Sequence, residues 1–121
     1  MTRPRVVADT DALLERVGGN RRLLSEVIRL FVEECPHMIG RMRAALDDGD
    51  SRALNRAAHA FKGSAANFAA DAVVYLAQQL ETDAANGDFT TLTGLFHGLE
   101  AETEYMLADL SASEVLARCE S

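Results

Sequence analysis

Apolar residues recur at steps of three and four along most of the chain, which is the spacing of one buried face of an α-helix. The first run covers residues 9–17 and ends at Gly18–Gly19, a typical helix stop. The second follows Asn20, a good N-cap; its apolar positions run from Leu24 to Leu46, and the run Asp47-Asp48-Gly49-Asp50 ends it. Its apolar pattern continues in phase past Pro36, so we expect one long helix, kinked at the proline, rather than two.

Three more helices are predicted downstream. One is expected over residues 51–67, one from Asp71 to the breaker Asn86-Gly87-Asp88, and one from there to about Leu110. Residues 111–121 either extend the last helix or form a short separate turn. The expected buried positions are Leu54, Ala58, Phe61, Ala65 and Phe68 in the first of these, Val73, Leu76, Ala77, Leu80 and Ala84 in the second, and Leu92, Leu95, Phe96, Leu99, Met106 and Leu110 in the third.

No stretch shows the strict alternation of a strand. Four helices joined by short loops predict an all-α fold, an antiparallel four-helix bundle with a short accessory N-terminal helix. A length of 121 residues fits a single domain over 1–121, with its core at 9–110 and a C-terminal extension at 111–121.

Composition narrows the class of protein. The chain is 48% apolar, enough to bury one core, and its net charge of −7 argues against nucleic-acid binding through phosphate neutralisation. Its two cysteines, Cys35 and Cys119, are far apart; a disulfide is formally possible, but such a pair is more typical of a reducing compartment. No apolar run approaches the ~20 residues that cross a bilayer. We therefore expect a cytoplasmic protein that binds neither membrane nor nucleic acid.

His59 is the candidate for chemistry. At ~100° per residue it lies about 140° from the core stripe of its helix, and Lys62 lies about 80° away, so both should be accessible to solvent. A neutral imidazole is a good nucleophile near neutral pH, and Lys62 could stabilise an anionic group on it. Glu81, at the margin of the next helix's core stripe, could lean across and orient the ring. An exposed histidine alone is most often an ordinary surface residue. The sequence Lys62-Gly63-Ser64 that follows His59 favours a functional role instead.

A possible partner surface surrounds His59. Gly63 lies on the same side of the helix, and a glycine inside a helix costs about 1 kcal/mol relative to alanine, which close approach of another molecule would explain. The residues expected to contact a partner are Arg52, Asn55, Arg56, Gly63, Ala66 and Gln78.

Other sites are less well supported. His37 and His97 have no partner at metal-ligand spacing, so we expect ordinary surface histidines and no metal. Ser64 lies five residues from His59 and on a different face, which is a poor arrangement for a nucleophile and base.

The pattern resembles the histidine-containing phosphotransfer (HPt) family. The resemblance runs from about Asp9 to about Leu110 and includes LLERVGGN and LLSEVIRLFVEECP upstream. One departure is Ala69, where the family usually has a glycine that permits a positive φ. The residues that carry the resemblance to the family are His59, Lys62, Gly63, Ser64, Asn67, Phe68, Leu76, Leu80 and Glu81.

The resemblance implies a relay. A phosphoryl group would pass from an aspartyl phosphate on a response-regulator receiver to His59 and then to another receiver, with a hybrid histidine kinase upstream. The receiver would bring the Mg²⁺, so the resemblance implies no cofactor on this chain, no ATP-binding site and a monomer. Two alternatives stay open: a non-catalytic adaptor that binds receivers with the same bundle, and the phosphoacceptor domain of a chemotaxis-type kinase.

Overall fold

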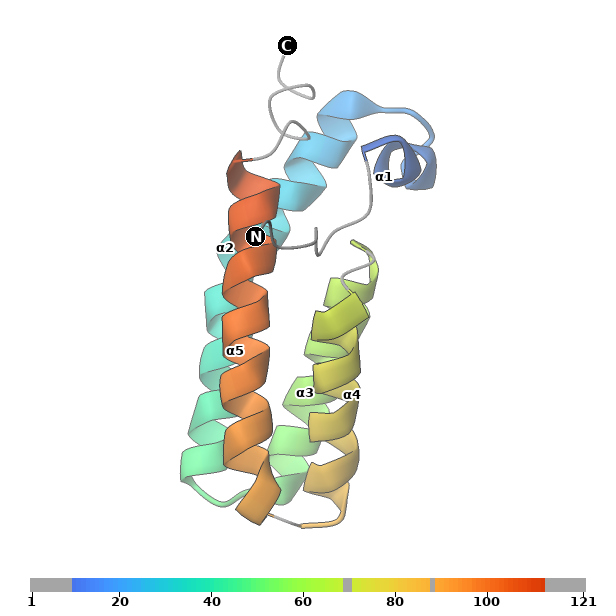
Figure 1. Ribbon diagram of the computed structural model, residues 1–121. Helices are drawn as coiled ribbons and strands as arrows, with labels where there is room; N and C mark the ends of the chain where they lie inside the picture. The colour runs from blue at the N-terminus through green and yellow to red at the C-terminus, as the bar shows by residue number, and fades with distance from the viewer. Residues whose placement is uncertain (1–9, 69–70, 88, 113–121) are drawn as a thin grey trace, which may run out of the picture.

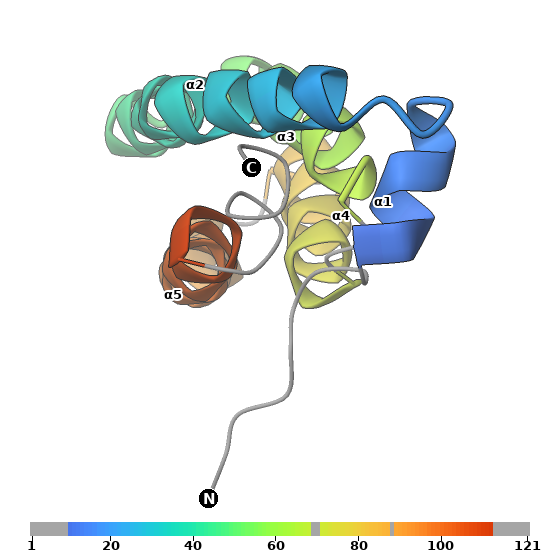
Figure 2. The same cartoon turned by 90° about the horizontal axis from the view of Figure 1, so that it is seen from above.

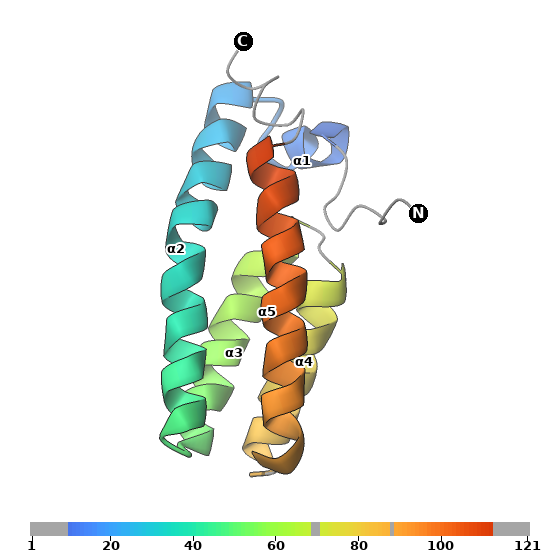
Figure 3. The same cartoon turned by 60° about the vertical axis from the view of Figure 1, so that its left-hand side comes forward.

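A computed structural model describes residues 10–68, 71–87 and 89–112. Its helices are α1 (Thr10–Arg16), α2 (Arg21–Asp47), α3 (Ser51–Ala66), α4 (Asp71–Ala85) and α5 (Phe89–Ala112). α2 to α5 form the predicted antiparallel four-helix bundle, and α2 and α5 extend past the end of the shorter α3–α4 pair (Figures 1 and 3). The all-α fold expected from the apolar pattern is confirmed.

Polar side chains cap the N-terminal ends of α2 and α3. Asn20 and Asp50 precede α2 and α3, and their side-chain oxygens accept hydrogen bonds from the amides of Leu23 (2.9 Å) and Ala53 (3.0 Å). α2 continues through Pro36 without interruption, as its unbroken apolar phase predicts. α5 runs on to Ala112, so the first two residues of the expected extension continue the helix; residues 113–121 lie outside the described part of the chain.

The core lies between the four long helices. All five core positions predicted for this segment are buried, four on α3 and the fifth, Phe68, just after its end. The ring of Phe31 on α2 packs against two of them, Phe61 (centroids 6.4 Å apart) and Phe68 (4.7 Å). These contacts seat α3 firmly, because each buried aromatic ring removes a large apolar area from water. One face of α3 is therefore anchored in the core, and its other faces carry the polar residues.

Two expected core residues are only half-buried, Leu76 on α4 and Leu95 on α5. Leu76 packs over Gly98 of α5, where a Cβ added to the glycine would lie 3.8 Å from the leucine side chain. Gly98 has no side chain to cover Leu76, and Leu76 remains partly exposed to water. Leu76 and Leu95 are thus partly buried and pack against the core instead of lying fully inside it.

α1 lies beyond the upper end of the α3–α4 pair in Figure 1, and beside that pair when the bundle is seen from above (Figure 2). The Arg16 guanidinium donates to the backbone oxygens of Ala66 (3.3 Å) and Asn67 (3.1 Å) at the end of α3. The last carbonyls of a helix have no intrahelical donor and carry partial negative charge, so a cation is favourable there. α1 therefore packs across an end of the bundle, and Arg16 supplies the contact.

Candidate functional site

The polar site lies on the faces that α3 and α4 turn toward each other near the surface. Asn55, His59 and Lys62 follow at steps of four and three along α3, so they project from one side of it, toward α4. The His59 side chain is 68% exposed, whereas the Lys62 side chain is 23% exposed. Beneath them Ala58 and Phe61 are fully buried, which fixes the direction in which His59 and Lys62 point.

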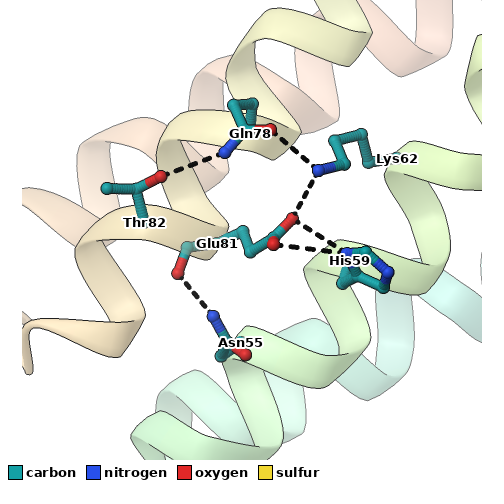
Figure 4. Close-up of polar contacts among 6 residues, drawn as sticks. All are labelled: Asn55, His59, Lys62, Gln78, Glu81 and Thr82. Atoms are coloured by element: carbon teal, nitrogen blue, oxygen red, sulfur yellow. Dashed lines mark hydrogen bonds and ion pairs between the residues drawn. The ribbon is translucent and has the colours of Figure 1, made fainter.

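Glu81 of α4 joins the two α3 residues. Its carboxylate oxygens both lie 3.2 Å from His59 Nδ1, and Oε1 lies 2.8 Å from Lys62 Nζ (Figure 4). The structure thus brings together the three residues that the sequence singled out for chemistry, and Glu81 leans across to α3 as expected.

These contacts determine which ring nitrogen is free. An ionised carboxylate only accepts hydrogen bonds, so Nδ1 must carry the ring proton that faces Glu81. The neutral ring then has its lone pair on Nε2, which points away from Glu81 in Figure 4. The site therefore presents an accessible, unprotonated nitrogen nucleophile.

Lys62 is held by a second acceptor on α4. Its Nζ donates to Gln78 Oε1 at 2.7 Å, and Gln78 Nε2 donates to Thr82 Oγ1 at 3.1 Å. Because the amide nitrogen is bonded to Thr82, the oxygen of Gln78 is the end that faces Lys62. Glu81 and Gln78 therefore hold the Lys62 ammonium group near the His59 ring.

The hydrogen bond from Lys62 has the largest effect on the pKa of Glu81. This hydrogen bond to the carboxylate, followed by that of His59, lowers the pKa of Glu81 below its ordinary value, although burial of the carboxylate opposes the change. Glu81 is therefore ionised at neutral pH, which is the state that the tautomer assignment requires.

The lowered pKa of Glu81 predicts a loss of stability in acid. A carboxyl group with a lower pKa in the folded than in the unfolded chain contributes stability above its unfolded pKa, and that contribution disappears as pH falls through the folded pKa. Urea unfolding between about pH 6 and pH 3 should therefore show a smaller decline in the free energy of unfolding for Glu81→Gln than for the wild type. Glu33→Gln, at an exposed position on α2, is the control and should decline like the wild type. An identical decline for wild type and Glu81→Gln would contradict the assignment.

The predicted partner surface is only partly outward-facing. Arg52, Arg56, Gly63 and Ala66 on α3 are exposed, and Arg56 lines a hollow of about 480 Å³ on the α2 side of the helix. Two other residues assigned to that surface contact the site itself. Gln78 binds Lys62, and Asn55 Nδ2 donates to the backbone oxygen of Glu81 at 2.7 Å. Ala69, where the sequence departs from the family pattern, lies outside the described residues.

Two contributing residues were not anticipated from the sequence. Thr82 orients Gln78, and Arg16 binds the end of α3. A threonine four residues after a glutamine is a weak local signal, and Arg16 is 50 residues from Ala66, so nothing nearby in the sequence indicated either contact.

The remaining candidate groups lie apart from this site. His37 and His97 are exposed, and Cys35 is a buried free thiol whose pKa burial raises to about 11. Within residues 10–68, 71–87 and 89–112, no three His, Cys, Asp or Glu side chains are grouped so as to hold a metal ion. No helix in the same ranges has the length and apolar character needed to cross a bilayer.

Comparison with known proteins places this geometry in context. A family model, the Hpt domain, matches residues 26–113, most of the chain. Among solved structures the chain is similar to histidine-containing phosphotransfer protein B (HptB) from Pseudomonas aeruginosa PAO1, with a TM-score of 0.80 and 24% sequence identity over 88% of this chain and 92% of that chain. At that identity the likeness shows the shared fold. A search of curated proteins gave no significant match.

Proposed function

Since the chain belongs to the Hpt domain family, a family of histidine phosphotransfer carriers in two-component signalling, we propose that His59 is the residue on which it carries a phosphoryl group. The observation that carries this proposal is the contact of both Glu81 oxygens with Nδ1, which leaves Nε2 free on an exposed ring. The direct test is transfer of phosphate from a phosphorylated receiver domain to wild type and to His59→Gln.

The proposed step is an in-line displacement at phosphorus. The Nε2 lone pair forms the new N–P bond while the bond from phosphorus to the receiver's aspartyl oxygen breaks, and that carboxylate leaves with the electron pair. The product ring carries hydrogen on Nδ1 and phosphorus on Nε2, so it is cationic. Glu81, 3.2 Å from Nδ1, would stabilise that positive charge. Transfer onward is the same step in reverse, with a different receiver.

Lys62 and the partner would share the charge of the moving group. Lys62 Nζ is stationed one helical turn from the ring and could donate to phosphoryl oxygens. The receiver would supply the Mg²⁺ and the aspartate, so this chain mainly positions a nucleophile. The proposed partners are response-regulator receivers, with a hybrid histidine kinase upstream, and we propose a monomer acting in the cytoplasm.

The carrier is favoured over the adaptor alternative. A binding module has no need of an ordered His59–Glu81–Lys62 cluster, whereas a nucleophile requires a fixed tautomer and a nearby cation. The sequence feature in favour of the adaptor is the departure from the family pattern at Ala69, which lies outside the described residues.

Gly63 provides a test of partner approach. A Cβ added at Gly63 meets no atom within 4 Å, so Gly63→Ala should leave the fold intact and stabilise the chain by up to about 1 kcal/mol. If the receiver packs closely there, the methyl group should slow phosphotransfer from the receiver roughly tenfold while labelling by the small donor phosphoramidate stays unchanged. Transfer rates from both donors, together with thermal unfolding, check this. Unchanged transfer from the receiver would show that Gly63 does not serve partner approach.

A further inference from the structure

Asn55 is turned toward the site rather than toward solvent. Its side chain is half-buried, and its amide nitrogen donates to the backbone oxygen of Glu81 at 2.7 Å. We propose that Asn55 is a positioning residue that sets the carboxylate of Glu81 against His59. This inference rests on the proposed function and replaces the receiver contact expected for Asn55 from the sequence.

α3 holds Glu81 at both ends. Asn55 binds its backbone oxygen, while His59 and Lys62 bind its carboxylate (Figure 4). A helix carbonyl has two lone pairs and uses one for its own helix, so the Asn55 amide can take the other without breaking α4. The hydrogen bond from Asn55 therefore positions the backbone of Glu81. The contacts with His59 and Lys62 position its carboxylate.

The spacing of these contacts follows from antiparallel packing. Four residues along a helix correspond to a rise of about 6 Å, so Asn55 and His59 meet α4 at heights one turn apart. Side chains on a helix lean toward its N-terminus, which for α4 is the direction from Asn55 toward His59 and Lys62. The Glu81 side chain covers that one turn, and Lys62 then reaches Gln78, one turn further on. A small slide of α4 along α3 would break the contact with the ring.

The chemical consequence concerns the tautomer of His59. A neutral imidazole carries its proton on either nitrogen, and the bond to Glu81 selects Nδ1. If Asn55 no longer holds α4, the carboxylate loses its fixed distance from Nδ1, and a fraction of the rings carries the proton on Nε2. Those rings have no lone pair on the reacting nitrogen.

Asn55→Ala tests the proposal through two readouts that need no receiver. ¹⁵N NMR of the His59 ring should change from a predominantly Nδ1–H tautomer to a mixture, and labelling of His59 by phosphoramidate should slow in proportion to the lost Nδ1–H fraction, about twofold for an even mixture. Asn55→Gln retains an amide donor and should recover part of both readouts. Asn86→Ala, at an exposed asparagine after α4, is the matched control and should match the wild type.

The outcomes separate positioning from partner contact and from general stability. Wild-type tautomer and phosphoramidate rate in Asn55→Ala, with only receiver transfer impaired, would overturn the proposal and make Asn55 a receiver contact. A lower melting temperature with an unchanged tautomer would also overturn it, because the role would then be structural alone. Should the wild type fail to be labelled at His59, the proposed function fails, whereas the tautomer measurement still decides the role of Asn55.

Discussion

Replacing His59 with glutamine is expected to abolish phosphoryl transfer, with a loss of at least about 10³-fold, because glutamine has no unprotonated nitrogen to attack phosphorus. Glutamine can still donate a hydrogen bond to Glu81, so the fold and the neighbouring contacts should persist. The measurement is incubation with a receiver phosphorylated with ³²P. The wild type should take up label that is acid-labile and alkali-stable, and two-dimensional ³¹P and ¹⁵N NMR should place the phosphorus on Nε2.

His97→Gln is the matched control for this experiment. His97 is also an exposed histidine, but it lies on α5, away from Glu81 and Lys62, so its variant should be labelled like the wild type. Equal labelling of His59→Gln and the wild type would remove His59 from the proposed reaction. Label on Nδ1 instead of Nε2 would refute the tautomer assignment while leaving His59 as the carrier.

Replacing Phe61 with alanine is expected to cost about 3–5 kcal/mol of stability, because it deletes a fully buried ring and leaves a cavity. Phe61 packs on Phe31 and lies on the underside of the helix that carries His59. Thermal and urea unfolding, followed by circular dichroism, should show a lowered melting temperature and midpoint.

Tyr75→Ala is the matched control for aromatic truncation. The Tyr75 side chain lies on α4 and the residue is 63% exposed, so its loss should change the free energy of unfolding by no more than about 0.5 kcal/mol. A cost for Phe61→Ala as small as that for Tyr75→Ala would mean that the α3 core is less tightly packed than the structure indicates.

The helices and the outward direction of His59 were accessible from the sequence for a physical reason. Burial repeats with the helical period, so Leu54, Ala58, Phe61 and Ala65 define the inner face of α3 by themselves. His59, far from that stripe, then has to be exposed. Breakers such as Gly49 also signal their role locally, since its φ of 66° is costly for other residues.

The direction of Asn55 was not accessible in the same way. A residue at the margin of the core stripe faces either solvent or the neighbouring helix, and the choice depends on what α4 presents at that height. The same limit applies to Leu76, whose burial depends on Gly98 of another helix. Residues at these boundaries become predictable only when the packing and vertical register of the helices are known.

The contacts of Lys62 with Glu81 and Gln78 bear on how tightly the protein would bind its phosphoryl group. Lys62 already makes two short contacts, with Glu81 and Gln78, so under its proposed role a phosphoryl group would have to compete with them for the ammonium. Breaking the contacts of Lys62 with Glu81 and Gln78 would offset part of the free energy gained when Lys62 binds the phosphoryl group. Weaker binding suits a relay, because a tightly bound phosphoryl group would be transferred onward slowly. Under the same proposal, Gln78→Ala, which removes one acceptor from Lys62, would leave the phosphoryl group more tightly bound.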